Sequence, residues 1–244
     1  MLRYISLAPS QPALRRVLQR PAATHETSPA LDGLSLKFVI WSRRAQGVVL
    51  DVGCGDGSVT QAAMARGAHV LAIDAEHTAI RQLLARVPSA QHPRLDARVG
   101  SLPDMDFKIA PFAAVHAARG LHFLDGDAVQ RSMRKFFRWL FPNGKLFISA
   151  LTPDGPFWEP FRDEFVRRGH AGFRWPGFMD DVTDFFPDYV GGPHSLHLLD
   201  ESVLRRELEA AGFIIEDVSC YPVPWNSGQH CCGIVARCAT AQHV

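Results

Sequence analysis

The stretch that decides the fold reads Val-Val-Leu-Asp-Val-Gly-Cys-Gly-Asp-Gly at positions 48–57. Its apolar beginning predicts a buried strand that ends close to Asp51. The glycines that follow, Gly53, Gly55 and Gly57, predict a tight turn where a ligand can approach bare backbone, because glycine has no Cβ. A helix-compatible stretch comes next, at residues 58–66. A strand, a glycine turn and a helix in this order indicate a cofactor that contains a nucleoside.

A second acid supports this interpretation. Asp74 ends the next apolar run, residues 70–73, and stands 23 positions after Asp51. An acid about 20 residues beyond a glycine turn is typical of a ribose contact in a βαβ unit. The alternative is a structural role, in which Asp51 and Asp74 only cap the ends of their strands.

The spacing of the glycines argues against a dinucleotide. The dinucleotide fingerprint is G-x-G-x-x-G, and Ser58 stands where its third glycine belongs. Asp51 would also place negative charge beside a pyrophosphate. A ligand with cationic groups and no phosphate fits better, and S-adenosylmethionine has an ammonium, a sulfonium and a ribose diol.

The chain resembles the class I S-adenosylmethionine-dependent methyltransferases, whose first motif has the form acid-x-G-x-G-x-G. Asp51, Gly53, Gly55 and Gly57 match that motif position for position. The resemblance covers residues 45–150 well and the C-terminal strands loosely. It implies an α/β, Rossmann-like fold with a mostly parallel seven-stranded sheet, an antiparallel last strand, helices on both faces and an inserted cap.

The resemblance also implies the cofactor residues. Asp51 would hold the methionyl ammonium, Asp74 the ribose hydroxyls, and the carbonyl of Ala117 the ammonium. Ser101 stands where the family often has an acid for the adenine amino group, which leaves that contact open. The complete predicted set is Asp51, Gly53, Cys54, Gly55, Asp74, Ala75, Ser101, Leu102 and Ala117.

The alternation of apolar runs and amphipathic stretches predicts a single α/β domain. We expect strands at 48–52, 69–73, 97–99, 112–117, 145–150, 213–218 and 232–237, and helices at 58–66, 77–86, 127–140 and 201–211. We divide the 244 residues into an N-terminal helical or lid segment (1–44), a cofactor-binding core (45–150), an aromatic cap (151–200) and a C-terminal helix with strands (201–244).

Residues 151–200 interrupt this alternation and contain ten of the 24 aromatic residues of the chain. The segment leaves the sheet at the edge where ligands bind in such folds, so we predict a substrate cap. Its candidate substrate residues are Trp158, Phe161, Trp175 and His197. The alternative is an extension of the hydrophobic core. The arginines of this segment predict either a clamp for an anionic substrate or a solvated helix face. These residues are Arg162, Arg167, Arg168 and Arg174.

His122 is the candidate catalytic residue. The pair Leu121-His122 matches a Leu-His pair that is common in the family after its fourth strand, and a histidine there can act as a general base. The alternative is a structural histidine under the cofactor. His116 alternates with the buried face of its strand, which predicts a packing role. The eleven histidines show no metal-binding spacing, so we predict no metal site.

Composition limits the partners and the compartment. A net charge of +1 gives no field that would recruit nucleic acid or an anionic membrane, and no apolar run is long enough to span one. The five cysteines lack the spacing of a disulfide framework, which favours a reducing compartment and the cytoplasm. Arginines without acids near the N-terminus leave a transit peptide as an alternative.

These patterns predict an enzyme that transfers a methyl group from S-adenosylmethionine to O or N of a small aromatic or apolar metabolite, as a monomer or homodimer. Ala117-Ala118-Arg119-Gly120 lacks the Asn/Asp-Pro-Pro-aromatic segment of DNA amino-methyltransferases. The alternatives are a carboxyl methyltransferase acting on an acidic metabolite, a non-catalytic cofactor-binding protein, and a nucleotide-dependent oxidoreductase.

Overall fold

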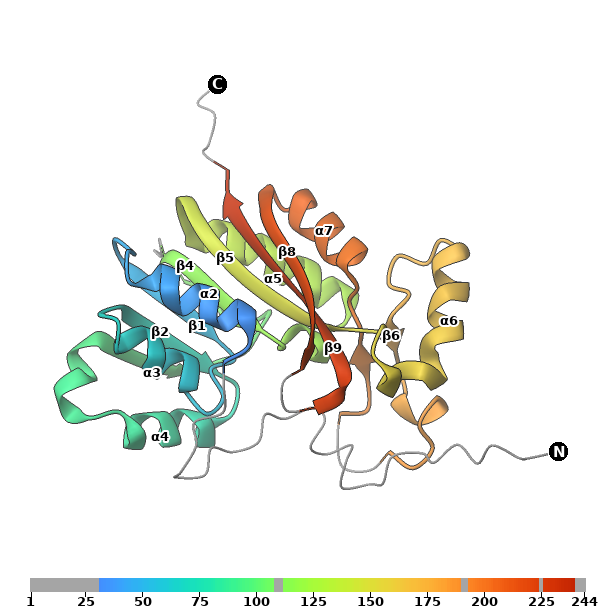
Figure 1. Cartoon of the computed structure of the whole chain (residues 1–244), viewed down its shortest axis with the longest axis horizontal. Coiled ribbons are helices and arrows are strands. Elements are labelled where there is room, and N and C mark those ends of the chain that lie inside the picture. Colours follow the sequence, from blue (N-terminus) through green and yellow to red (C-terminus); the bar gives the residue numbers. More distant parts are fainter. Residues whose placement is uncertain (1–30, 108–111, 190–192, 224–225, 240–244) are drawn as a thin grey trace.

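The computed structural model describes residues 31–107, 112–189, 193–223 and 226–239, and its centre is a seven-stranded sheet (Figure 1). The strand order is β3-β2-β1-β4-β5-β9-β8, and only β9 runs antiparallel to its neighbours. The strands are β1 (Val48–Val52), β2 (His69–Asp74), β3 (Leu95–Val99), β4 (Phe112–Ala118), β5 (Leu140–Thr152), β8 (Phe213–Val223) and β9 (Asn226–Cys238). The predicted fold class and the predicted antiparallel last strand are confirmed.

Helices cover both faces of the sheet (Figure 1). On one face lie α2 (Gly33–Ser42), α3 (Ser58–Met64) and α4 (His77–Arg86), which pack on the side of β1 that carries Val49. On the other face lie α5 (Gly126–Trp139) and α7 (Glu201–Ala210), which pack on the side of Leu50. Alternate residues of the strands therefore belong to two separate hydrophobic cores.

An aspartate caps the start of three of these helices. The carboxylates of Asp32, Asp125 and Asp200 each accept a hydrogen bond from the backbone N–H three residues later in the chain, at 2.8, 2.7 and 2.9 Å. Each cap satisfies one of the N–H groups that a helix start leaves unpaired. Gly67 and Gly212, shortly after the ends of α3 and α7, have φ values of 95° and 99° that glycine adopts most easily.

β5, β8 and β9 differ most from their predicted bounds. β5 starts at Leu140 and includes a turn at Pro142-Asn143-Gly144, where Asn143 has a φ of 63°. The pairing of β4 with β5 shifts register between Phe112 and Ala114, which accommodates this irregularity. β8 and β9 are both longer than predicted and form a long antiparallel pair at the sheet edge.

The insert between β5 and α7 contains η3 (Pro156–Trp158), α6 (Glu159–His170), β6 (Phe178–Met179), η4 (Val182–Asp184) and β7 (Leu196–His197). Its two ends meet, because Leu199 N–H donates a 2.8 Å hydrogen bond to the carbonyl of Leu151. Trp158 and Phe161, at 1% and 0% exposure, lie in a hydrophobic cluster that belongs largely to the insert. The insert thus has a small hydrophobic core beside the sheet, and its predicted role as a substrate cap remains a prediction.

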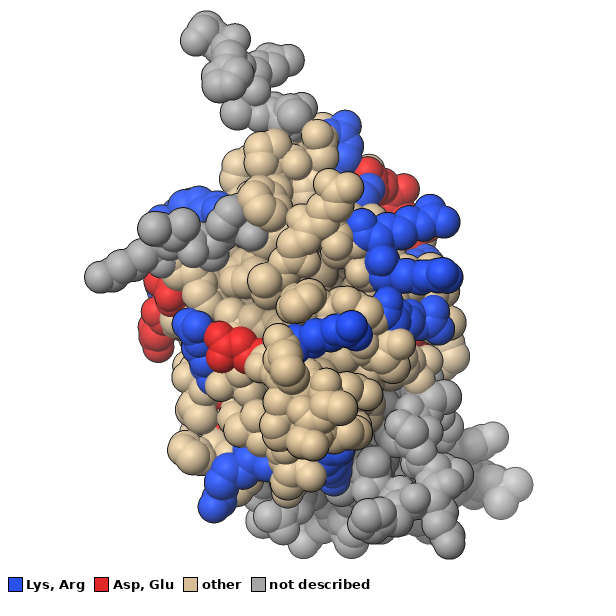
Figure 2. All heavy atoms as spheres, turned by 90° about the vertical axis from the view of Figure 1, so that its left-hand side faces the viewer, with Lys and Arg blue, Asp and Glu red and all other residues tan. Residues whose placement is uncertain are grey.

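The surface charge agrees with the near-neutral composition. On the face in Figure 2, basic side chains are scattered over a largely uncharged surface with some acidic ones among them. Among the helices in the described ranges, none is both long enough and apolar enough to cross a membrane.

Candidate active site

The glycine turn has the geometry that only glycine adopts without strain. Gly53, Gly55 and Gly57 have φ values of 68°, 53° and 76°, in the left-handed region. A Cβ added to Gly53 would meet nothing within 4 Å, whereas one added to Gly57 would lie 2.4 Å from Leu83 Cδ1. Gly57 therefore allows α3 and α4 to pack closely, and Gly53 and Gly55 leave open backbone at the strand end.

Asp74 lies beside this turn at the carboxyl end of β2. Its Oδ2 accepts the Gly55 N–H at 2.8 Å, and its Oδ1 accepts the Glu76 N–H at 2.9 Å. Each oxygen of an ionised carboxylate has a second lone pair, so two acceptor positions remain. Asp74 orients the glycine turn and can also accept from a ligand hydroxyl.

The predicted adenine residues follow along the same edge of the sheet. Gly100 N–H donates a 2.9 Å hydrogen bond to the carbonyl of Asp74, which joins the loops after β2 and β3. Ala75 and Ser101 are exposed on these loops, and Leu102 is half-buried. The carboxyl ends of β1, β2 and β3 thus bring together the glycine turn, Asp74 and the Ser101-Leu102 pair.

Asp51 has a different environment from the one predicted. Asp51 is 1% exposed. Its Oδ1 lies 2.8 Å from His116 Nδ1, and its Oδ2 accepts a hydrogen bond from Thr60 Oγ1 at 2.6 Å. His116 Nε2 lies 3.1 Å from Ser35 Oγ on α2. His116 also stacks on Phe38, so the predicted packing role is right but omits two hydrogen bonds. The network ties α2, α3, β1 and β4 together.

Ala117 is buried and pairs with Val52 of β1, at the strand edge beside the glycine turn. Two residues later the chain turns at Arg119, whose φ is 54° and whose N–H donates a 2.8 Å hydrogen bond to the carbonyl of Ser149. A non-glycine residue with this φ is uncommon and often marks a functional loop. Arg119 thereby places a guanidinium group at the carboxyl edge of the central strands.

His122 is fully buried in η2 (Leu121–Phe123), close to Arg119. Neither ring nitrogen has a hydrogen-bond partner among the described residues. Burial, with a smaller effect from the charge of Arg119, lowers the pKa of His122 to about 3. The ring is therefore neutral near pH 7, so one ring nitrogen can accept a proton or a hydrogen bond from a ligand and the other can donate one.

The insert supplies His197 to the same region. Its Nδ1 lies 2.9 Å from the carbonyl of Leu124, just after η2, and its Nε2 is buried without a partner in the described structure. Burial lowers the pKa of His197 to about 4, so this ring is also neutral near pH 7.

The other predicted substrate residues have packing environments. Trp158 and Phe161 are inside the core of the insert. The ring of Trp175 packs on Gly126 at the start of α5, and the guanidinium carbons of Arg174 and Arg206 lie 5.5 and 5.2 Å from its centre. Arg174 also pairs with the buried Glu207 at 3.1 Å. These contacts anchor the insert, and the predicted contacts of its aromatic residues with substrate remain predictions.

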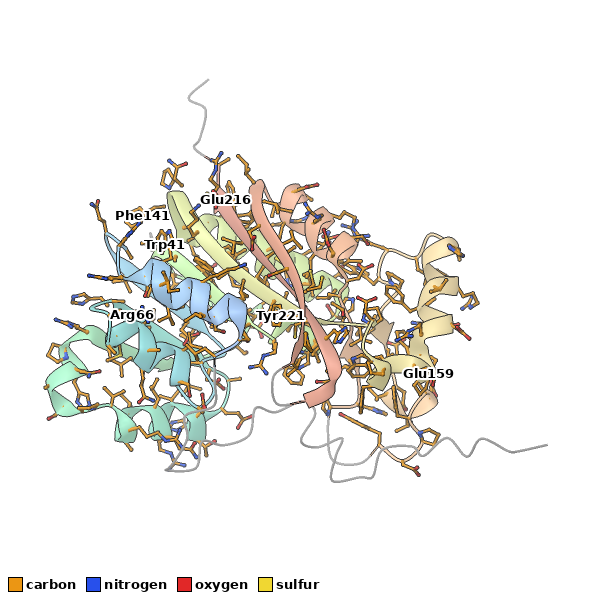
Figure 3. All side chains as sticks on the ribbon, viewed as in Figure 1. Trp41, Arg66, Phe141, Glu159, Glu216 and Tyr221 are labelled. Carbon is orange, nitrogen blue, oxygen red and sulfur yellow. The ribbon has the colours of Figure 1, made fainter. Side chains whose placement is uncertain are left out.

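Four buried polar side chains on β5, β8 and β9 were missed by sequence reasoning. They have buried oxygen or nitrogen atoms without hydrogen-bond partners in the described part of the chain: Ser149, Thr152, Tyr221 and Gln229. The Tyr221 and Ser149 hydroxyls lie near each other without hydrogen-bond geometry, and Tyr221 is placed close to α2 (Figure 3). Burial raises the pKa of Tyr221. Buried unpaired polar groups at one edge of a sheet are typical of a ligand site.

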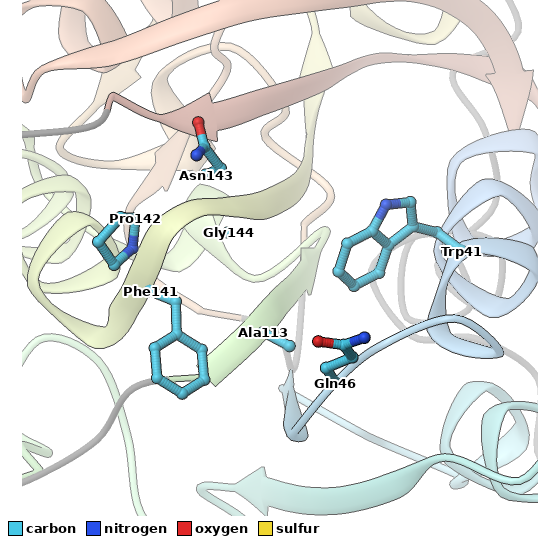
Figure 4. A pocket seen from close by; sticks show the side chains of 7 residues that line it. All are labelled: Trp41, Gln46, Ala113, Phe141, Pro142, Asn143 and Gly144. Carbon is cyan, nitrogen blue, oxygen red and sulfur yellow. The ribbon is translucent and has the colours of Figure 1, made fainter.

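A hollow of about 370 Å³ lies at the other end of the strands, near the amino end of β4, where Trp41 and Phe141 flank Gln46 and Ala113 (Figure 4). It adjoins the amino end of β4 and the turn within β5. Ligands in α/β sheets of this kind bind at the carboxyl ends of the strands, so this hollow is separate from the candidate site.

Sequence comparisons identify relatives of this chain. A family model described as a methyltransferase domain matches residues 49–144. A ubiquinone biosynthesis O-methyltransferase of Xanthomonas axonopodis pv. citri is 34% identical over 196 residues, which cover 78% of this chain and 72% of the relative. An enzyme of the same description from Xylella fastidiosa is 33% identical over 132 residues, which cover 52% of this chain and 50% of that enzyme.

Solved structures share the fold at lower identity. A S-adenosylmethionine-dependent methyltransferase from Methanosarcina mazei has a TM-score of 0.65 and 19% identity, over 83% of this chain and 97% of that one. A second structure is the 1,6-didemethyltoxoflavin-N1-methyltransferase of Burkholderia thailandensis with bound 1,6-didemethyltoxoflavin and S-adenosylhomocysteine. It has a TM-score of 0.62 and 20% identity, over 85% of this chain and 79% of that one.

Proposed function

Because this chain belongs to the class I S-adenosylmethionine-dependent methyltransferases, we propose that it methylates a hydroxyl oxygen of a small aromatic acceptor that carries an acidic group. The observation that carries the proposal is a buried polar region at the carboxyl ends of β4 and β5, where the neutral imidazole of His122 and the Tyr221 hydroxyl, which has no hydrogen-bond partner in the described structure, lie within the electrostatic field of Arg119. The relative that is 34% identical is described as an O-methyltransferase, which favours oxygen over nitrogen.

The residues at the sheet edge fit S-adenosylmethionine. The open backbone at Gly53, Cys54 and Gly55 would lie along the methionyl part, and the free acceptor positions of Asp74 would bind the ribose hydroxyls. Ser101 and Leu102, with Ala75, would border the adenine. Asp51 would act indirectly, because its two oxygens already hold His116 and Thr60. When bound, the cofactor supplies the activated methyl group.

Arg119 would select and orient the acceptor. Burial and, to a smaller extent, the charge of Arg119 lower the pKa of His122, and the same charge partly offsets the rise that burial causes in the pKa of Cys231. Both side chains therefore lie within the electrostatic field of Arg119. A carboxylate on the acceptor would pair with this charge, and a charge-assisted hydrogen bond in a dry site is worth more than one in water. The hydroxyls of Tyr221 and Ser149 would complete the polar contacts.

His122 would accept the proton of the acceptor hydroxyl. The low pKa makes the empty site weakly basic, because burial and Arg119 both oppose a positive imidazolium. An acceptor anion beside Arg119 would offset that positive charge and raise the pKa of His122. Binding of the correct acceptor would therefore activate the base, and a neutral analogue would not.

The test is a panel of paired acceptors, each an aromatic hydroxy acid and the corresponding amide or ester, scored by release of S-adenosylhomocysteine. We expect turnover of acids to exceed that of their neutral partners, and Arg119→Gln to remove this preference while S-adenosylhomocysteine affinity, measured by calorimetry, changes little. His122→Gln should lower kcat by about 10²–10⁴-fold. Tyr221→Phe should raise the acceptor KM.

Three results would change the proposal. Equal turnover of acids and neutral analogues would remove the acidic group from the acceptor. Methyl esters as products would identify the carboxylate itself as the acceptor atom. Cofactor binding without turnover of any acceptor in a broad panel would favour a non-catalytic binding protein.

A further inference from the structure

Two cysteines and a glutamate meet at the base of the insert, on the side of the β8–β9 pair opposite to Tyr221 and Cys231. Cys220 of β8 and Cys232 of β9 are directly opposed in the antiparallel pairing, and Glu201 is the first residue of α7. Their Sγ atoms and a carboxylate oxygen all lie within 4.8 Å of one another. Cys232 is completely buried and Cys220 is exposed, so the group spans from the core to the surface.

We propose that Glu201, Cys220 and Cys232 bind a thiophilic divalent cation of the zinc class, with a fourth position for water. Zinc takes thiolate and carboxylate ligands in tetrahedral geometry, with Zn–S distances of about 2.3 Å, which separates two sulfur ligands by about 3.8 Å. The donors therefore need movements of about 1 Å or less to close on an ion. Side-chain rotation on the two strands and the helix start can supply this.

The surroundings give an ion access and a place for its water ligand. A hollow of about 390 Å³ opens beside Cys220 and Glu201, and Asp154, Ser202 and Arg205 also line it. Arg205 Nε donates to Glu201 Oε1 at 2.7 Å, so Oε2 remains available as the ligand atom. The nearby Asp200 carboxylate is already used in the helix cap, where it accepts from Val203 N–H at 2.9 Å.

Acidic side chains outnumber basic ones around the two sulfurs. The hollow beside them is lined by three carboxylates, from Asp154, Asp200 and Glu201, and by one guanidinium group, from Arg205. A divalent cation would neutralise this excess of negative charge, and both cysteines would bind it as thiolates with release of their protons.

The ion would brace both ends of the insert. Asp154 stands where the insert leaves β5, and Glu201 stands where it returns to the core. Coordination would fasten the start of α7 to the β8–β9 pair and so limit movement of the insert relative to the sheet. The prediction of no metal site relied on local spacing in the sequence, which cannot reveal ligands that only strand pairing brings together.

The experiment is an anaerobic titration of the reduced, metal-free full-length protein with Co²⁺, followed by displacement with Zn²⁺. We expect one equivalent of Co²⁺ to produce sulfur-to-cobalt charge-transfer absorption, which Zn²⁺ abolishes. Cys220→Ser and Cys232→Ser should each weaken Zn²⁺ binding by more than about 100-fold in competition with a chromophoric chelator, and Glu201→Gln by about 10-fold or more. Cys231→Ser is the matched control, because Cys231 is adjacent in sequence but lies in the core of the insert.

Hydrogen exchange provides a second readout that does not depend on activity. Zn²⁺ should slow exchange in residues 151–155 and 199–205 of the wild-type protein and of Cys231→Ser, but not of Cys220→Ser. Absence of the charge-transfer band, or its persistence in the Cys220→Ser/Cys232→Ser variant, would overturn the proposal. So would a protein whose Cys220 and Cys232 form a disulfide under mild oxidation as fast in the presence of Zn²⁺ as in its absence.

Discussion

His116 Nδ1 lies 2.8 Å from Asp51 Oδ1, and the two residues are directly opposed on the adjacent strands β4 and β1. His116 extends this contact to Ser35 of α2, at 3.1 Å. The acid that begins the glycine motif is therefore connected to a helix that precedes the motif in the chain. Through this connection, α2 helps to set the end of β1 from which the cofactor turn departs.

Loss of the contact between His116 and Asp51 should lower the free energy of unfolding. Replacing His116 with Leu leaves the Asp51 carboxylate buried beside an apolar group, and breaking a buried pair in this way costs about 3–5 kcal/mol. Ser35→Ala removes only the outer hydrogen bond and should cost about 1 kcal/mol. Urea denaturation of both variants measures these differences. Equal effects would mean that Asp51 finds a new partner in His116→Leu.

Asp74→Ala should weaken S-adenosylhomocysteine binding by about 1–3 kcal/mol, because ribose hydroxyls lose a charged acceptor. Asp74→Asn keeps an oxygen for Gly55 N–H and separates the effect on the turn from the effect on the ligand. Asp96→Ala, a surface acid on β3 paired with Arg98, is the control. Calorimetry showing unchanged affinity in Asp74→Ala would remove the ribose assignment, and tight NADH binding by the wild type would contradict the cofactor.

The first and third glycines of the turn should respond differently to alanine. Gly57→Ala meets Leu83 at 2.4 Å and forces a positive φ, so we expect a loss of stability of about 2–4 kcal/mol. Gly53→Ala meets no protein atom and should lose only about 1–2 kcal/mol from its φ. Its methyl group points into open space, so cofactor affinity should fall more than in Gly57→Ala. The opposite order in calorimetry would place the cofactor elsewhere.

Stability should depend on the buried histidines between pH 5 and pH 7. Folding lowers the pKa of His122 from 6.5 to about 3, so below pH 6.5 the unfolded chain binds a proton that the native protein does not. The unfolding free energy should therefore fall by about 2 kcal/mol from pH 7 to pH 5 for this residue. His197, whose pKa falls to about 4, acts in the same direction. Denaturation of His122→Gln should show a shallower pH dependence, and an unchanged slope would contradict the assignment.

Trp158 and Trp175 should behave as structural residues to different degrees. Trp158→Ala removes a 1% exposed side chain from the insert core and should cost about 3–5 kcal/mol, which differential scanning calorimetry would detect. Trp175→Ala should cost less, because its ring is only partly buried. We expect S-adenosylhomocysteine affinity to stay within about twofold in both. A raised acceptor KM in a stably folded Trp158→Ala would restore its predicted contact with substrate.

The regular part of the fold was predictable because local signals agree there. The predicted helix at 77–86 matches α4, and the glycine turn and both strands beside it lie where expected. β3 was predicted too short, since its residues are largely exposed and its sequence is not apolar. β8 and β9 were also underestimated, because their pairing with each other extends them past their apolar stretches.

The site was predictable only where one continuous motif encodes it. Gly53, Gly55 and Asp74 lie as the motif requires, but Ser35, Ser149 and Tyr221 come from distant elements and carry no local signal. His116 shows the limit most clearly, because alternation along a strand predicts which residues are buried and says nothing about their hydrogen-bond partners. The aromatic content of the insert likewise could not distinguish a ligand cap from a separate hydrophobic core.

The hydrogen bond between Leu199 and Leu151 makes the insert a detachable module. A segment that departs and returns at one point can be lengthened, exchanged or deleted without changing the register of any strand in the sheet. The insert also has a hydrophobic core that is largely its own, and Trp175 and His197 connect it to α5 and to the chain after η2. We therefore expect that residues 153–198 can be transplanted in chimaeras without loss of cofactor binding when these two contacts are kept.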